Sequence, residues 1–172
     1  CRELIIKSLR IYKAACPDAE YNGTEHFWKF PSGAKIYFGS MPNQMSYLNY
    51  QGLSYSYIAF DELTHFTLEE YEYMISRNRA DGDGLRVYIR ATANPGGIGH
   101  GWVKERFITA SPPNVPYTVH SEITDKNGKK IKLERERIFI PSSVFDNEAL
   151  LSNDPGYLSN LAILPDSQKK AL

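Results

Sequence analysis

A short apolar run at residues 55–60 constrains the possible folds more than any other part of the sequence. Its length and its bulky side chains predict a buried strand of the kind found in parallel sheets. A helix is expected next, at about residues 68–77, with Thr64 or Thr67 as its cap, and an alternating segment at residues 85–93 predicts another strand. Strands that alternate with helices favour a three-layer α/β domain with a largely parallel sheet.

The other segments predict hairpins and short helices around this sheet. Residues 26–39 alternate on both sides of a Pro-Ser-Gly turn, and Asn127-Gly128 is a strong hairpin signal between the strands expected at residues 117–123 and 130–140. These hairpins would lie at the edges of the sheet. Helical spacing predicts further helices at residues 2–14, 101–108, 147–151 and 155–162.

Composition excludes several classes of protein. The 172 residues are 42% hydrophobic, which suits one domain with a packed core. Lysine plus arginine equals aspartate plus glutamate at 20 each, so the chain is not a basic nucleic-acid coat, although this balance leaves room for a local basic patch. Cys1 and Cys16 form no CxxC pair and indicate neither a zinc ribbon nor a disulfide framework. No apolar run is long enough to span a membrane.

The two ends of the sequence suggest a fragment. The chain begins with Cys1 rather than methionine, and it stops at Leu172 within an expected helix. We therefore expect it to be part of a longer protein.

Two adjacent carboxylates follow the apolar run directly. Asp61 and Glu62 would stand at the carboxyl end of a strand, which is where open α/β sheets bind ligands. In nucleotide hydrolysis one carboxylate holds the Mg²⁺ shell and a second group deprotonates the attacking water, so Asp61 would take the first role and Glu62 the second. Alternation along the strand is expected to separate the two side chains. The alternative is that both acids merely begin a solvated loop before a helix.

A second polar motif, Thr92-Ala93-Asn94, ends the strand expected at residues 85–93. The hydroxyl of Thr92 and the amide of Asn94 could hydrogen-bond a terminal phosphate or its attacking water. The alternative is an ordinary strand end with Asn-Pro turn chemistry.

The glycine-rich stretch at residues 96–101 leads into a helix and invites comparison with a phosphate-binding loop. It contains neither GxxxxGK followed by Ser or Thr, nor GxGxxG with its required spacing. We therefore expect a flexible turn.

Two weaker features complete the set of candidate residues. The hairpin tip carries four lysines, which are Lys126, Lys129, Lys130 and Lys132. They could contact a DNA backbone, because phosphate contacts need only positive charge within reach, and a solvated turn is the alternative. His65 and His100 lie near the two strand ends, but their spacing supports no metal site, so a structural role is expected.

Several short motifs occur in a fixed order along the chain. The first are Trp28-Lys29-Phe30-Pro31-Ser32-Gly33-Ala34-Lys35-Ile36, Tyr50-Gln51-Gly52-Leu53, Phe60-Asp61-Glu62-Leu63-Thr64-His65-Phe66 and Arg77-Asn78-Arg79. The next are Thr92-Ala93-Asn94-Pro95-Gly96-Gly97, Gly99-His100-Gly101-Trp102-Val103, Phe139-Ile140-Pro141-Ser142-Ser143 and Asp146-Asn147. Taken in this order, from about Trp28 to the C-terminus, they resemble the signatures of bacteriophage terminase large subunits.

The resemblance implies a RecA-like P-loop ATPase fold that is incomplete at its N-terminus. It makes Asp61 the Walker B aspartate, Glu62 the catalytic glutamate, and Thr92, Ala93 and Asn94 the motif that couples hydrolysis to movement. The implied cofactors are ATP and Mg²⁺. Asp61, Thr92 and Asn94 would contact the nucleotide, and Asp61 would hold the metal through water.

The resemblance also implies a motor that moves viral double-stranded DNA into a procapsid. The implied partners are the portal protein, the terminase small subunit and further copies of the large subunit in a ring, in the host cytoplasm during viral assembly. Residues 1–140 would form the ATPase core, and residues 141–172 would form a helical linker toward a nuclease domain.

The 172 residues lack two parts of the family pattern, the Walker A loop and the nuclease carboxylates. Without the lysine and amides of that loop most phosphate contacts are lost, so we expect this chain alone to be inactive. The family's arginine finger is not identified. Arg79 and Arg90 are candidates, although such arginines usually pair with nearby acids.

Two other interpretations stay open from the sequence. One is a non-catalytic DNA-binding or assembly module with a degenerate NTPase fold. The other is a different RecA-like ATPase, such as a helicase.

Overall fold

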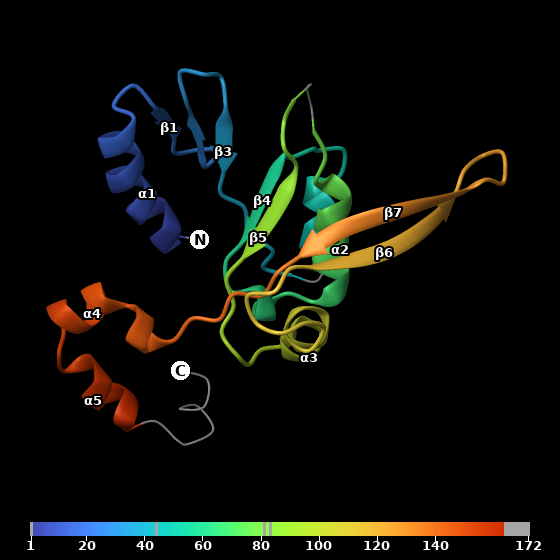
Figure 1. The fold of residues 1–172 in the computed structure, drawn as a ribbon. Helices are drawn as coiled ribbons and strands as arrows, with labels where there is room; N and C mark the ends of the chain where they lie inside the picture. The colour runs from blue at the N-terminus through green and yellow to red at the C-terminus, as the bar shows by residue number, and fades with distance from the viewer. Residues whose placement is uncertain (1, 44, 81, 83, 164–172) are drawn as a thin grey trace. The chain divides into compact units, whose positions relative to one another are not determined.

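The chain is a mixed α/β protein in two compact units, Cys1–Leu53 and Ser54–Leu172 (Figure 1). The structure is a computed structural model, and it describes residues 2–43, 45–80, 82 and 84–163. The functional division expected at residue 140 stays a prediction.

The first unit consists of one helix and a small antiparallel sheet. Helix α1 (Arg2–Ala15) precedes strands β1 (Glu20–Asn22), β2 (Phe27–Lys29) and β3 (Lys35–Tyr37), which pair in the order β1-β2-β3, and the 3₁₀ turn η1 (Ser46–Tyr50) follows. The expected helix and the expected hairpin are both confirmed. Strand β1 was not expected, because three residues are too few to show alternation.

Trp28 holds the sheet of this unit on its helix. The side chain is fully buried, and its indole nitrogen donates to Ser8 Oγ at 2.9 Å, while Ser8 Oγ donates to the Ile5 carbonyl at 2.7 Å. The rings of Tyr12 and Tyr21 pack against the indole at centroid distances of 5.6 Å and 5.2 Å. The polar atom of this large apolar side chain is therefore satisfied where it is buried.

The second unit begins with a strand-helix-strand motif. Strands β4 (Tyr57–Phe60) and β5 (Tyr88–Ala91) are parallel and in register from Tyr57↔Tyr88 to Phe60↔Ala91, and α2 (Leu68–Arg77) lies between them in the sequence. At the start of the strands, the buried Asn78 amide lies 3.1–3.3 Å from the carbonyls of Tyr55, Ser56 and Tyr88. Because the strands are parallel, the segments that leave them emerge next to each other.

Helix α2 begins with a complete capping box. Thr67 Oγ1 accepts a hydrogen bond from the Glu70 amide at 3.2 Å, and the Glu70 carboxylate accepts one from the Thr67 amide at 2.8 Å. Two of the amides that a helix start leaves unpaired are thereby satisfied. Of the two caps considered from the sequence, Thr67 is the one that is used.

The rest of the second unit follows in short elements. They are η2 (Leu63–His65), α3 (His100–Val103), the π-helical turn η3 (Lys104–Ile108), β6 (Tyr117–Thr124), β7 (Lys130–Arg137), η4 (Val144–Asp146), α4 (Glu148–Asn153) and α5 (Tyr157–Ala162). Strands β6 and β7 form the expected antiparallel hairpin. The helices expected after Pro141 are also present.

The prediction of a largely parallel sheet is confirmed only for β4 and β5. In the described part of the chain, β1–β3 and β6–β7 form separate antiparallel sheets. Short turns connect these strands, and a short turn can only join antiparallel neighbours. The mixed α/β class is confirmed, whereas the three-layer RecA-like arrangement stays a prediction. None of the described helices combines the length and the apolar character needed to cross a membrane.

The capping box gives a stability prediction. Thr67→Ala removes the side-chain acceptor at the start of α2 and should lower the free energy of unfolding by about 1 kcal/mol. Thr67→Ser keeps the hydroxyl and should lose much less. Urea denaturation followed by circular dichroism measures both, and equal losses in the two variants would contradict a capping role.

Candidate functional site

The candidate site lies where β4 and β5 end. Asp61 and Glu62 follow Phe60, the last residue of β4, and Thr92 follows the last residue of β5. Thr92 donates its amide to the Phe60 carbonyl at 2.9 Å, and its own carbonyl accepts from the Leu63 amide at 2.7 Å. Backbone pairing thus continues past both strands and holds the two polar segments against each other.

The side chains of the site form one hydrogen-bond network. Thr92 Oγ1 donates to Asp61 Oδ1 at 2.9 Å and accepts from the Glu62 amide at 3.2 Å. Asn94 Nδ2 donates to Glu62 Oε1 at 2.8 Å, and the Asn94 amide donates to Glu62 Oε2 at 3.3 Å. Asp61, Thr92 and Asn94 are exposed and Glu62 is half-buried. The residues selected from two distant motifs therefore meet in one place.

Glu62 has a left-handed backbone conformation, with φ 56° and ψ 59°. Strand alternation was expected to separate Asp61 from Glu62, and this expectation is wrong because β4 has already ended at Phe60. The two carboxylates hydrogen-bond different residues, Asp61 with Thr92 and Glu62 with Asn94. A left-handed conformation at a residue other than glycine costs free energy and persists where surrounding contacts enforce it. The Thr92 and Asn94 contacts provide that constraint.

The network is compatible with a magnesium site that takes further ligands from a nucleotide and from water, but these side chains do not form a complete site by themselves. Mg²⁺ in nucleotide sites uses one or two carboxylates and takes its other ligands from phosphates and water. Asp61 is exposed and Thr92 orients one of its carboxylate oxygens, so the residue fits a water-mediated contact. Among the described residues, no group of three or more His, Cys, Asp or Glu side chains could hold a metal.

The glycine-rich stretch packs against the loop that follows the two acids. Gly99 is buried and donates its amide to the Thr64 carbonyl at 2.7 Å. A Cβ atom at Gly97 would lie 2.5 Å from the Thr64 carbonyl oxygen, and one at Gly99 would lie 2.4 Å from the Phe66 carbonyl oxygen. Sequence analysis predicts a flexible turn here, but the packing shows that these glycines permit a close backbone approach.

Two amides of this stretch hydrogen-bond groups of the protein itself. Gly96 donates to His100 Nδ1 at 3.0 Å, and Gly99 donates to Thr64. A phosphate loop needs such amides directed at the anion, so the Gly96 and Gly99 amides are not available for that role. The contact from Gly96 also gives His100 the structural role that was expected.

Trp102 is a supporting residue that the site analysis of the sequence missed. Its indole nitrogen donates to the Phe66 carbonyl at 3.0 Å, and its ring stacks on Tyr71 of α2 at 5.0 Å. Burial raises the pKa of the Tyr71 hydroxyl, which keeps this core residue neutral. The loop that carries the two acids is thus fixed between α2 and α3. The available signal was a large aromatic residue directly after the glycines.

A family model for the N-terminal part of T4likevirus-type terminase large subunits matches residues 10–168. The chain belongs to the terminase large subunit family. This membership gives it a role in phage DNA packaging. Searches of curated proteins and of solved structures find no match.

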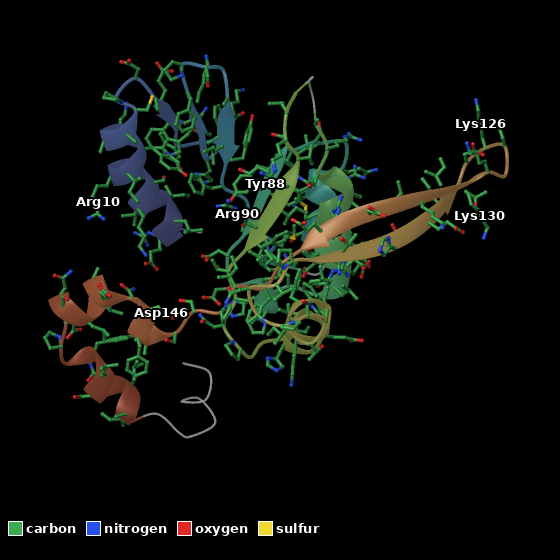
Figure 2. The ribbon with its side chains drawn as sticks, viewed as in Figure 1. Arg10, Tyr88, Arg90, Lys126, Lys130 and Asp146 are labelled. Atoms are coloured by element: carbon green, nitrogen blue, oxygen red, sulfur yellow. The ribbon has the colours of Figure 1, made fainter. Side chains whose placement is uncertain are left out.

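The arginine finger of the terminase family is not identified by the geometry. The guanidinium of Arg90 lies 5.6 Å from the centre of the Tyr88 ring (Figure 2). Arg79 donates its backbone amide to the Tyr55 carbonyl at 3.1 Å, and its side chain is exposed. Neither arginine forms an ion pair with a described acid, contrary to the expected pairing.

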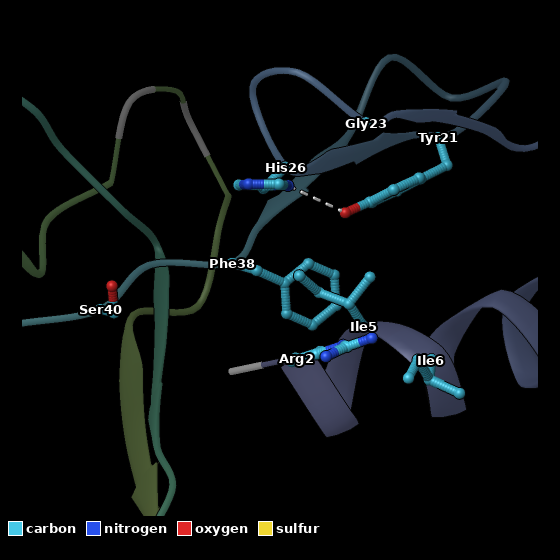
Figure 3. Close-up of a pocket in the computed structure, with 8 residues that line it drawn as sticks. All are labelled: Arg2, Ile5, Ile6, Tyr21, Gly23, His26, Phe38 and Ser40. Atoms are coloured by element: carbon cyan, nitrogen blue, oxygen red, sulfur yellow. Dashed lines mark hydrogen bonds between the residues drawn. The ribbon is translucent and has the colours of Figure 1, made fainter.

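The first unit of this terminase chain has an open cavity of about 520 Å³ (Figure 3). Ile5 and Phe38 give it an apolar wall, and Arg2 lines it as well. Tyr21 and His26 are hydrogen-bonded at its rim, with 3.3 Å between the hydroxyl and Nδ1. It contains none of the site residues expected from the sequence.

Glycine substitutions test whether close packing holds the site. Gly99→Ala places a methyl group against two backbone oxygens and the Trp102 indole, so we expect a loss of about 1–3 kcal/mol in the free energy of unfolding. Gly101→Ala is the matched control, because no atom lies within 4 Å of its added Cβ. Thermal denaturation of both variants provides the measurement. A Gly99→Ala protein as stable as Gly101→Ala would show that the turn is loosely packed.

Proposed function

We propose that this chain is the part of a terminase motor that hydrolyses ATP and couples hydrolysis to DNA movement. In this proposal Asp61 holds the Mg²⁺ shell, Glu62 activates water, and Thr92-Ala93-Asn94 is the coupling segment. The observation that carries it is the network in which Thr92 and Asn94 hydrogen-bond Asp61 and Glu62 across the two strand ends. A solvated loop before a helix would not need four polar residues from two motifs to meet.

The two carboxylates suit different tasks. Magnesium, when bound with ATP, would neutralise phosphate charge. Asp61 is exposed, so it would hold the metal by accepting hydrogen bonds from the water molecules bound to it. Glu62 is half-buried with its two oxygens on Asn94, so a small change at Asn94 would direct this carboxylate toward a water molecule and let it accept the proton.

The same contacts support the proposed coupling role. Asn94 is the third residue after β5, and its amide and side chain both hold Glu62. Its carbonyl also accepts from Thr64 Oγ1 at 2.8 Å. Movement of the acid-bearing loop and movement of the 92–94 segment are therefore linked by direct hydrogen bonds, which is the property that a coupling motif needs.

The complete protein supplies the rest of the proposal. We infer a RecA-like core in which β4 and β5 are two strands of a larger sheet, and a Walker A loop from outside these 172 residues. The partners in this proposal are viral double-stranded DNA, the portal protein, the small subunit and neighbouring large subunits in a ring. Assembly in the host cytoplasm is the corresponding setting.

The family match sets the helicase interpretation aside. The non-catalytic module keeps one observation in its favour, which is that no GxxxxGK followed by Ser or Thr occurs in the sequence. The two proposals differ in turnover, because a module has none to lose.

Replacing the proposed base tests the function in the intact terminase. Glu62→Gln keeps the size of the side chain and one acceptor for Asn94, but its amide cannot accept a proton from water, so we expect ATP turnover to fall at least about a hundredfold with ATP binding retained. Glu105→Gln, on the exposed turn η3, is the control for loss of one acid. Steady-state phosphate release and nucleotide binding measure the two effects. Normal turnover in Glu62→Gln would show that Glu62 is not the base.

A second variant separates coupling from chemistry. Asn94→Ala removes the amide that holds Glu62 Oε1, so we expect the intact terminase to package less DNA for each ATP hydrolysed. The ratio of packaged DNA to released phosphate is the quantity to measure. If the ratio matched that of the unmodified protein, Asn94 would have no part in coupling.

A further inference from the structure

The hairpin β6–β7 is anchored at one end and exposed at the other (Figure 1). At its base, the Tyr117 hydroxyl donates to the Arg106 carbonyl of η3, and the Arg137 guanidinium lies 5.9 Å from the centre of the Phe107 ring. Each strand has eight residues, so the ribbon extends roughly 25 Å from that base. Beyond Val119 every residue of β6 is exposed, and so is every residue of β7 before Arg137.

The hairpin tip, defined here as residues 124–132, concentrates positive charge. It carries Asp125 and four lysines, a net charge of +3, whereas the whole chain is neutral. Figure 2 shows Lys126 and Lys130 at the far end of the ribbon. The remainder of the chain is therefore net negative, and the tip is a local exception.

The single acid of the tip does not neutralise these lysines. Asp125 Oδ1 accepts hydrogen bonds from the amides of Asn127 and Lys129 at 2.8 Å and 2.9 Å, so its charge holds the turn. Lys130 pairs with Glu122 of β6 at 2.8 Å. Among the described residues, Lys126, Lys129 and Lys132 form no ion pair, and all three are exposed. The turn presents Lys126 and Lys129 to solvent, and strand β7 presents Lys132.

Duplex DNA fits this tip better than a single strand does. Single-strand sites combine positive charge with aromatic rings on which bases stack, and residues 124–132 contain no aromatic residue. A two-stranded ribbon fits the major groove of B-DNA, where phosphates flank it on both sides. The exposed apolar side chains of the ribbon, Ile123, Ile131 and Leu133, share one face with Arg135 and Arg137. Both arginines lie nearer the base of the hairpin, so the four lysines are the cations of its far end.

We propose that the tip of the β6–β7 hairpin binds the phosphate backbone of duplex DNA through Lys126, Lys129, Lys130 and Lys132. The choice of duplex DNA rests on the proposed packaging function. The contacts themselves need neither ATP nor Glu62, so the two proposals fail separately. The contact is independent of base sequence, because lysines on phosphates position a protein without reading bases.

The salt dependence of DNA binding tests the proposal on the full chain without nucleotide or Mg²⁺. Anisotropy of a labelled duplex gives the affinity at several salt concentrations. Each lost phosphate contact lowers the slope of log affinity against log salt by about 0.9, so the four-lysine Lys→Gln variant should lose about 3–4 in slope. The matched control replaces four exposed lysines elsewhere, Lys7, Lys29, Lys35 and Lys104, and should keep the slope of the unmodified chain.

A second variant changes affinity in the opposite direction. Glu122→Gln releases Lys130 from its ion pair and should tighten duplex binding and steepen the salt dependence. Equal losses in the tip and control variants would overturn the proposal, as would unchanged binding in both. Stronger binding of the unmodified chain to anionic phospholipid vesicles, or to a single strand, than to the duplex would also overturn it. If Glu62→Gln kept its DNA binding, the tip would still be the DNA-binding site, even if Glu62 proved not to be the base.

Discussion

The parallel register of β4 and β5 places Phe60 beside Ala91, and the contacts of the candidate site begin from that pair. The next residue on each chain continues the pairing through the Thr92 amide and carbonyl. Because both strands run in the same direction, their two polar segments emerge at the same edge. A shift of one residue would turn Thr92 away from Asp61 and break the network.

The glycine-rich stretch and Trp102 hold the loop that follows β4 in place. Gly97, Gly99 and Trp102 pack on the carbonyls of Thr64 and Phe66, so the loop after Glu62 cannot relax its left-handed turn without losing those contacts. The same segment continues through α3 into η3, whose Arg106 carbonyl holds the base of the hairpin. A continuous series of contacts therefore connects the ends of β4 and β5 to the base of the β6–β7 hairpin.

Local signals predicted the elements well and the packing poorly. Helix α2 has the expected bounds because its spacing and the Thr67 cap are encoded within a few residues. The Asn-Gly turn placed the β6–β7 hairpin for the same reason. The role of Gly99 was missed, because a glycine at a flexible turn and a glycine at a close backbone contact look identical in sequence. Only the position of the Phe66 carbonyl distinguishes them.

The sequence by itself determined the residue types of the site, their positions at two strand ends and the order of motifs that resembles the terminase family. It could not determine that Asn94 holds Glu62 or that Thr92 bridges the two acids, because 30 or more residues separate these partners. It also could not determine the left-handed turn at Glu62. Those features depend on long-range pairing and on side chains that meet only when the strands are in register, so the tertiary structure alone decided them.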